Sequence, residues 1–194
     1  DYRPRSTLVT AETPVPRARY PVVDIHGHAN LTTPGRIDEI VAALDELNVQ
    51  VYVAADNLSG ERLTQTLEAL RSSPHRDRFR VLAGIDLRNV GPGSGERAAR
   101  EVEAAIRAGA VGVGEVSKGL GLSIRKADGS RLAIDDPELD PVWETLARLG
   151  VPAFIHTGDP PEFFEPMDLK NERWLELALF PNRRVAGPDQ VSFE

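Results

Sequence analysis

The stretch Pro21-Val22-Val23-Asp24-Ile25-His26-Gly27-His28 decides how the rest of this chain is interpreted. It is an apolar run that ends in two histidines one residue apart, which predicts a β-strand with His26 and His28 on the same face. Two imidazoles a few ångströms apart make half of a site for a divalent metal ion. Gly27 between them, lacking a Cβ, would let the backbone come close to the ion. Two histidines that only hydrogen-bond at a strand end would show the same pattern.

The composition of the chain fits one globular domain and excludes several classes of function. Its 194 residues are 41% hydrophobic and 27% charged, which is enough to build a sizeable core. A formal net charge of −7 argues against binding nucleic acid through its phosphates. No apolar run approaches the roughly 20 residues that a membrane span needs. The absence of cysteine excludes disulfides and thiolate ligands.

Short apolar runs recur along the chain at intervals of roughly 30 residues, as in βα units. They are rich in Val, Ile, Ala and Gly and occupy residues 21–27, 50–55, 79–85, 110–116 and 151–156. Because most are nearly continuous rather than alternating, they predict strands of a parallel sheet that is covered on both faces. Amphipathic stripes typical of helices follow them at 36–47, 61–71, 96–107, 138–149 and 168–180.

Repeated βα units build one of two architectures, an open doubly wound sheet or a closed (β/α)8 barrel of the TIM type. A barrel takes about 250 residues, so a chain with five units is either an open sheet or an incomplete barrel. Residues 1–20 are rich in Pro and Arg and lack periodicity, and we expect them to form an extended arm before the domain at 21–194.

Residues that can bind a metal ion fall repeatedly at the ends of these strands, where parallel α/β folds carry their sites. We expect His26, His28 and His156 to be ligands of a divalent ion. Glu115 would be a further ligand or the partner of a neighbouring arginine. These ligand types suit Zn²⁺, our first choice, and also Mn²⁺ and Fe²⁺.

Other polar and aromatic residues near the strand ends are candidates for substrate binding. Lys118 would be a solvated lysine, the partner of a substrate carboxylate, or a carboxylated lysine that bridges metal ions. The loop at 119–135 predicts a hairpin with an Asp-Gly turn, and its Arg125 would meet an anionic substrate or remain solvated. Phe164, which follows His156 closely, would line an apolar pocket or pack against the fifth helix.

Four segments together resemble the amidohydrolase superfamily, in the branch related to aminocarboxymuconate-semialdehyde decarboxylase. They are VVDIHGH, SKGLGLSIRKADG, DDPELDPVWETLARLGVPAFIHTGDP and the NERW at 171–174, and the resemblance spans 21–180. It implies a (β/α)8 barrel with one or two divalent metals. It also implies first-strand ligands at His26 and His28 and a fifth-strand ligand at His156. The family often adds a fourth-strand ligand, for which Glu115 is the candidate.

The resemblance and the metal half-site together predict a hydrolase that uses a metal-activated water on a small-molecule substrate. A non-oxidative decarboxylase would use the same site. A truncated, non-catalytic metal-binding module is the third alternative, and its open sheet edges would allow a homo-oligomer. The family also uses a sixth-strand histidine and an eighth-strand general-base aspartate, which we expect in residues beyond Glu194. Exported members have similar Pro/Arg-rich arms, which favours an extracytoplasmic location.

Overall fold

The computed structural model describes residues 9–31, 33–156 and 158–185, and its centre is one parallel sheet. The strands follow one another in sequential order, with each one parallel to the next. They are β1 (Val22–Gly27), β2 (Val49–Leu58), β3 (Phe79–Ala83), β4 (Gly112–Val116) and β5 (Ala153–Ile155). The predicted five-stranded α/β repeat is therefore confirmed.

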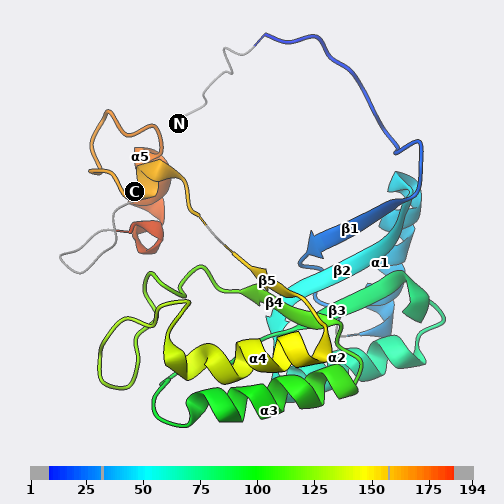
Figure 1. Ribbon diagram of the computed structural model, residues 1–194. Helices are drawn as coiled ribbons and strands as arrows, with labels where there is room; N and C mark the ends of the chain where they lie inside the picture. The colour runs from blue at the N-terminus through cyan, green and yellow to red at the C-terminus, as the bar shows by residue number, and fades with distance from the viewer. Residues whose placement is uncertain (1–8, 32, 157, 186–194) are drawn as a thin grey trace.

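Four helices cover one face of this sheet, as Figure 1 shows. They are α1 (Pro34–Leu47), α2 (Gly60–Ser72), α3 (Ser94–Arg107) and α4 (Asp140–Leu149). Both α1 and α4 end in a left-handed cap, at Asn48 with φ 62° and at Gly150 with φ 64°, from which the chain turns directly into a strand. Short 3₁₀ turns precede β3 and α4, at η1 (Arg76–Arg78) and η2 (Pro137–Leu139).

The sheet curls so strongly that its two edge strands approach each other. In a flat sheet β1 and β5 would lie roughly 19 Å apart, four strand spacings of about 4.8 Å. Instead, the ring of His26 on β1 lies 4.5 Å from the ring of Phe154 on β5, measured between centroids. A doubly wound sheet also reverses its strand order at a switch point, and this sheet does not. Curl and order together identify the arrangement as an incomplete barrel.

The core lies between the sheet and the four helices and has two parts. One joins β2, β3 and the segment after β1 to α1 and α2, and includes Ile37, Leu67 and Val81. The other joins β4 to α3, α4 and the loop after β4, and includes Val113 and Leu132. Since Leu132 belongs to that loop and is fully buried, the loop packs as part of the domain.

The loop after β4 forms the predicted hairpin. Arg125 pairs antiparallel with Arg131, and the Lys126 N–H donates to the carbonyl of Ser130 at 2.8 Å. The turn between them ends at Gly129, whose φ of 86° explains the Asp-Gly sequence. An ion pair from Lys126 to the buried Asp136, at 2.8 Å, ties the hairpin to the segment before α4.

The prediction that every strand is covered on both faces is wrong for β1. Val23 is 56% exposed and Ile25 is 65% exposed. Among the described residues β1 pairs only with β2, so one edge of the strand and the side chains beside it stay open. The prediction holds for β3 and β4, whose residues are buried apart from the exposed Arg80 and the partly buried Glu115.

The fifth helix is shorter than the amphipathic stripe at 168–180 predicts. The helix α5 runs only from Trp174 to Leu179, between the 3₁₀ turns η3 (Pro161–Phe163) and η4 (Pro181–Arg183). The side chain of Asn171 is buried and hydrogen-bonds to the backbone. Its amide donates to the carbonyl of Glu162 at 2.7 Å, and its oxygen accepts the N–H of Arg173 at 2.9 Å. These bonds stand where the first turn of the predicted helix would be. Such side-chain bonds to the backbone compete with helix formation.

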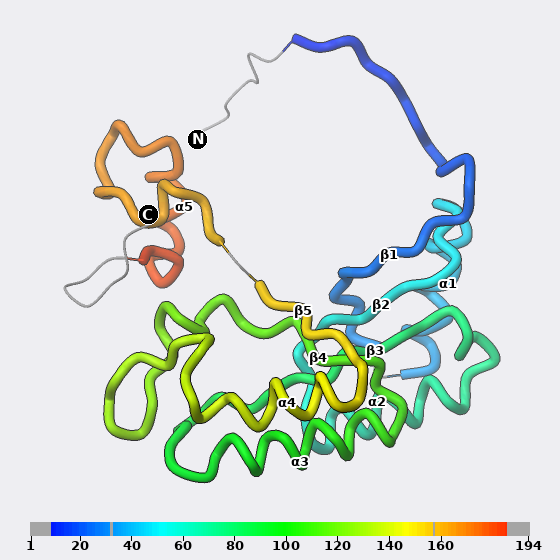
Figure 2. The backbone as a smooth tube through the Cα atoms, viewed as in Figure 1, coloured from blue at the N-terminus to red at the C-terminus, as the bar shows by residue number. Residues whose placement is uncertain are grey.

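The chain leaves the sheet at both ends, as the tube in Figure 2 shows. Residues 9–20 form no helix or strand, and Arg17 and Ala18 fasten them to the last carbonyls of α1. The segment that contains α5 lies beyond the end of β5 and folds back on itself, because the Val185 N–H donates to the carbonyl of Phe163 in η3 at 2.9 Å. Among the helices of the described residues, none combines the length and the apolar character needed to cross a membrane.

Candidate metal centre

The carboxyl ends of β1 and β4 bring two histidines and a carboxylate into one cluster. Nε2 of His26 lies 3.3 Å from Oε2 of Glu115, and Nε2 of His28 lies 3.2 Å from the same oxygen. The two imidazole nitrogens are 3.2 Å apart. Ligand atoms held tetrahedrally at 2.0–2.2 Å from a Zn²⁺ ion lie roughly 3.3–3.6 Å from one another. The three side chains are therefore spaced as ligands of one ion would be, and they form a group that could hold one.

The third predicted histidine reaches the cluster from the other side of the same carboxylate. His156 follows β5, and its backbone N–H donates to the carbonyl of Val116 at 3.0 Å, which holds it beside β4. Its Nδ1 contacts Oε1 of Glu115. The structure thus brings together all four predicted ligands, with the carboxylate of Glu115 between His156 and the first-strand pair.

Glu115 is the least exposed member of the cluster, at 14% for its side chain. Burial by itself raises the pKa of this carboxyl, but hydrogen bonds from His156 and His26 outweigh it, so the pKa of Glu115 ends below its ordinary value. The carboxylate is consequently ionised at neutral pH, which is the form that binds metal ions.

Asp56 on β2 supports the cluster, and the sequence analysis assigned it no role. Its Oδ1 lies 3.7 Å from Nδ1 of His28, while its Oδ2 accepts the N–H of Asn30 at 3.3 Å. Burial raises the pKa of Asp56, and the N–H of Asn30 and the charge of His28 offset this only in part. A carboxylate on the second nitrogen of a ligand histidine is common in metal sites. The sequence could have indicated Asp56, because this residue directly follows the predicted strand at 50–55.

Gly27 makes room for a buried side chain. A Cβ at this position would overlap the ring and hydroxyl of Tyr52, which packs directly against the glycine. Tyr52 is 8% exposed, and burial, with the charges of Asp56 and Asp24 adding to it, raises the pKa of its hydroxyl to about 12. Gly27 therefore has a packing role that the sequence analysis did not predict.

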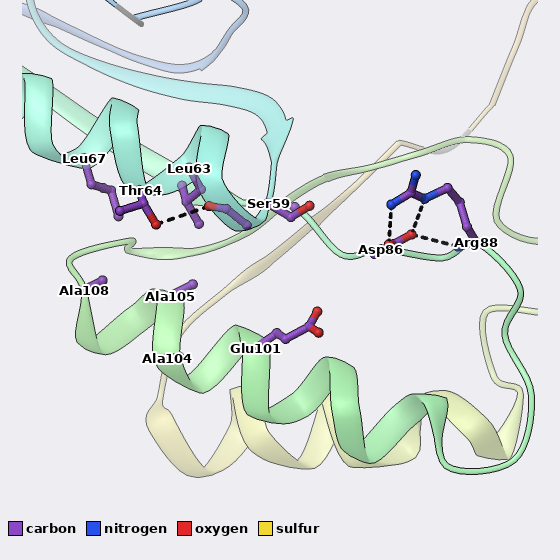
Figure 3. A pocket seen from close by; sticks show the side chains of 12 residues that line it. Ser59, Leu63, Thr64, Leu67, Asp86, Arg88, Glu101, Ala104, Ala105 and Ala108 are labelled. Carbon is purple, nitrogen blue, oxygen red and sulfur yellow. Dashed lines mark hydrogen bonds and ion pairs between the residues drawn. The ribbon is translucent and has the colours of Figure 1, made fainter.

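Three members of the cluster, His28, Glu115 and His156, line a cavity of about 270 Å³. Its walls come from the ends of β2, β4 and β5 and consist of His28, Ala55, Asp56, Asn57, Glu115, Ser117, Lys118 and His156. A larger cavity of about 630 Å³ lies between α2 and α3, with Leu63 and Ala105 on its walls and the Asp86–Arg88 ion pair near its mouth (Figure 3). No histidine lines that cavity, so the residues with metal chemistry lie in the smaller one.

The predicted substrate-binding residues lie at different distances from this cavity. Lys118 lines it, and its Nζ donates to the buried carboxylate of Asp159 at 2.8 Å. Arg125 lies in the hairpin beside Arg131, and Phe164 follows η3. Neither of these two is among the described residues that line the cavity.

A curled parallel sheet with a histidine and carboxylate cluster at its strand ends defines a barrel-type α/β protein with a site suited to a divalent ion. The chain belongs to the amidohydrolase family, whose model matches residues 23–185. This range includes every strand and helix from β1 to α5, apart from Val22 at the start of β1. Comparisons with curated proteins and with solved structures returned no match. Family and fold together support a metal-dependent, hydrolase-type activity.

Proposed function

We propose that this protein is a hydrolase that uses a metal-activated water on a small-molecule substrate. The spacing of 3.2–3.3 Å among the ligand atoms of His26, His28 and Glu115 carries the proposal. His156 on the other oxygen of Glu115 completes the proposed ligand set. Zn²⁺ is the ion that we propose, and Mn²⁺ and Fe²⁺ suit the same nitrogen and oxygen ligands.

When bound, such an ion lowers the pKa of a water to about 7 and polarises the bond to be cleaved. The side chains of this protein would hold and orient the ion. Glu115 supplies the negative charge, and Asp56 fixes the orientation of His28. Lys118, in the wall of the cavity, is proposed to contact the substrate. Arg125 and Phe164 are proposed substrate contacts on the basis of the sequence.

Metal analysis combined with a hydrolysis assay tests the proposal. The purified protein should retain about one zinc ion per chain after dialysis and hydrolyse at least one ester, lactone or amide of a small-molecule panel. A chelator should abolish this activity, and added Zn²⁺ should restore it. Turnover that is unchanged by the chelator, or the absence of any stoichiometric ion, would contradict the proposal.

The same panel separates the two alternatives that share this metal site. Small carboxylic acids included in it would release CO₂ if the protein were a non-oxidative decarboxylase. Stoichiometric zinc without turnover of either kind would instead indicate a non-catalytic metal-binding module. Either result would replace the hydrolase assignment.

A further inference from the structure

A second cavity, of about 260 Å³, adjoins the candidate metal centre. One wall is the loop after β4 and the other is the chain that leaves η4. The lining residues are Ser117, Lys118, Gly119, Leu122, Ser123, Asp159, Asn182, Arg183, Arg184 and Val185. Ser117 and Lys118 also line the cavity of the metal centre. Because two residues line both, the two cavities are adjacent.

Among the described side chains that line the second cavity, one positive charge has no ion-pair partner. The lysine of this cavity, Lys118, is neutralised by Asp159 at 2.8 Å, and Arg183 is neutralised by Glu176 at 2.6 Å. Arg184 is different, because no carboxylate among residues 9–31, 33–156 and 158–185 forms an ion pair with it. Arg184 is exposed, and no carboxylate of those described residues competes with an anion for it.

The remaining polar side chains of this cavity can donate hydrogen bonds. The oxygen of Ser117 accepts the N–H of Gly119 at 3.1 Å, which leaves its own O–H free to donate. Ser123 contributes a second hydroxyl and Asn182 contributes a side-chain amide. A guanidinium group surrounded by neutral donors matches a carboxylate, which it can bind through two parallel hydrogen bonds. The single positive charge of Arg184 matches the single negative charge of a carboxylate better than the charge of a phosphate, which is about −1.5 to −2.

We propose that this cavity binds a carboxylate group of the substrate, with Arg184 as the principal cation, while the bond to be hydrolysed lies at the metal centre. The cavity is smaller than the roughly 300–1,000 Å³ of sites that enclose whole ligands, so it accommodates one group of a larger molecule. The substrate class is then a small ester or amide that carries a carboxylate at its far end. This substrate class rests on the proposed hydrolase function, whereas the carboxylate site itself does not.

Binding to the metal-free protein tests the site without any contribution from catalysis. The probe is monomethyl glutarate, and dimethyl glutarate is its neutral counterpart; both are titrated by calorimetry or by protein NMR. The wild-type protein should bind the monoester saturably and the diester far more weakly. Arg184→Ala should weaken monoester binding by about tenfold or more. The affinity of Arg184→Lys should lie between those of the wild type and Arg184→Ala, because lysine keeps the charge but cannot form two parallel hydrogen bonds to a carboxylate.

Arg76→Ala is the matched control, since Arg76 is an exposed arginine in η1, which precedes β3 and so lies at the amino end of the sheet. It should bind the monoester like the wild type. Equal affinity of wild type and Arg184→Ala, or equal affinity for the two esters, would overturn the proposal. Tighter binding of inorganic phosphate than of the monoester would overturn the assignment to a carboxylate.

Turnover by the zinc-loaded protein tests the substrate class. Attack of water on the ester carbonyl of monomethyl glutarate releases methanol and leaves glutarate. The wild type should prefer the monoester over the diester in kcat/KM, and Arg184→Ala should reduce this preference mainly by raising KM. If neither ester is hydrolysed while binding behaves as expected, the carboxylate site stands and the substrate class fails. The hydrolase function itself fails only if the whole panel gives no turnover.

Discussion

The carboxylate of Asp56 on β2 lies 3.7 Å from Nδ1 of His28, while Nε2 of the same ring lies 3.2 Å from Glu115. One imidazole is thus held between two carboxylates that come from different strands. Asp56 is itself fixed by the N–H of Asn30 at 3.3 Å. A carboxylate from β2 thus faces the ring of a histidine that follows β1.

Asp56→Asn should weaken metal binding without unfolding the protein. The amide keeps the shape of the carboxylate but loses the charge that orients His28, and loss of such a partner costs about 10–100-fold in metal affinity. Competition with a chromogenic zinc chelator measures the change. Asp38→Asn is the matched control, because Asp38 faces the half-exposed His75 at 3.5 Å, outside the cluster. Equal zinc affinity of the two variants would argue against the role of Asp56.

His26→Ala and His28→Ala should each reduce the zinc content sharply and leave the far-ultraviolet circular dichroism spectrum nearly unchanged. Both side chains are substantially exposed, at 40% and 52%, so their removal leaves no large buried cavity. His75→Ala should retain the zinc content of the wild type. If both single variants of the cluster kept full occupancy, the ligand assignment would be wrong.

Gly27→Ala should destabilise the protein by about 1–3 kcal/mol, the usual cost of overpacking. The new methyl group would displace the ring of Tyr52, which is buried against the glycine. Urea unfolding measures the change in the free energy of unfolding. A spectroscopic titration should also show the pKa of Tyr52 falling from about 12, because the displaced ring is better solvated.

Gly35→Ala is the control for this substitution. Gly35 lies in the first turn of α1, and a Cβ there would meet no atom within 4 Å. Its substitution should leave stability unchanged or raise it slightly, since alanine favours helix. If Gly27→Ala were as stable as Gly35→Ala, the contact with Tyr52 would not constrain this position.

Asp86 should contribute stability that disappears at acidic pH. Its hydrogen bonds with Arg88, at 2.6–3.0 Å, lower its pKa to about 2 in the folded protein from an ordinary value of 3.8. A lowered pKa means that the folded state favours the ionised form. The contribution is therefore complete above about pH 4 and is lost as the pH falls towards 2.

Urea unfolding of the wild type and of Asp86→Asn tests this expectation. The variant should be the less stable of the two at pH 6, and the difference should shrink as the pH is lowered through 3.8 towards 2. A difference that stays constant over this range would show that the ion pair with Arg88 contributes no pH-dependent stability. The effect should be modest, because Arg88 is 85% exposed.

Much of the candidate centre could be predicted from sequence, because the responsible rules act over short distances. The alternation of side chains along a strand brings His26 and His28 together. The parallel βα repeat directs Glu115 and His156 to the same edge of the sheet as that pair, although they are 41 residues apart in the chain. The left-handed caps at Asn48 and Gly150 follow equally from residue type and position.

The tertiary structure alone decided the relationships that depend on the curl of the sheet and on the course of its loops. The contact of Phe154 with His26 requires two edge strands to approach each other, and Lys118 beside Arg184 requires the chain after α5 to return to β4. Local patterns specify which face a side chain occupies. The curvature of a sheet and the position of a distant loop result from the packing of all its elements together, so no short stretch of sequence encodes them.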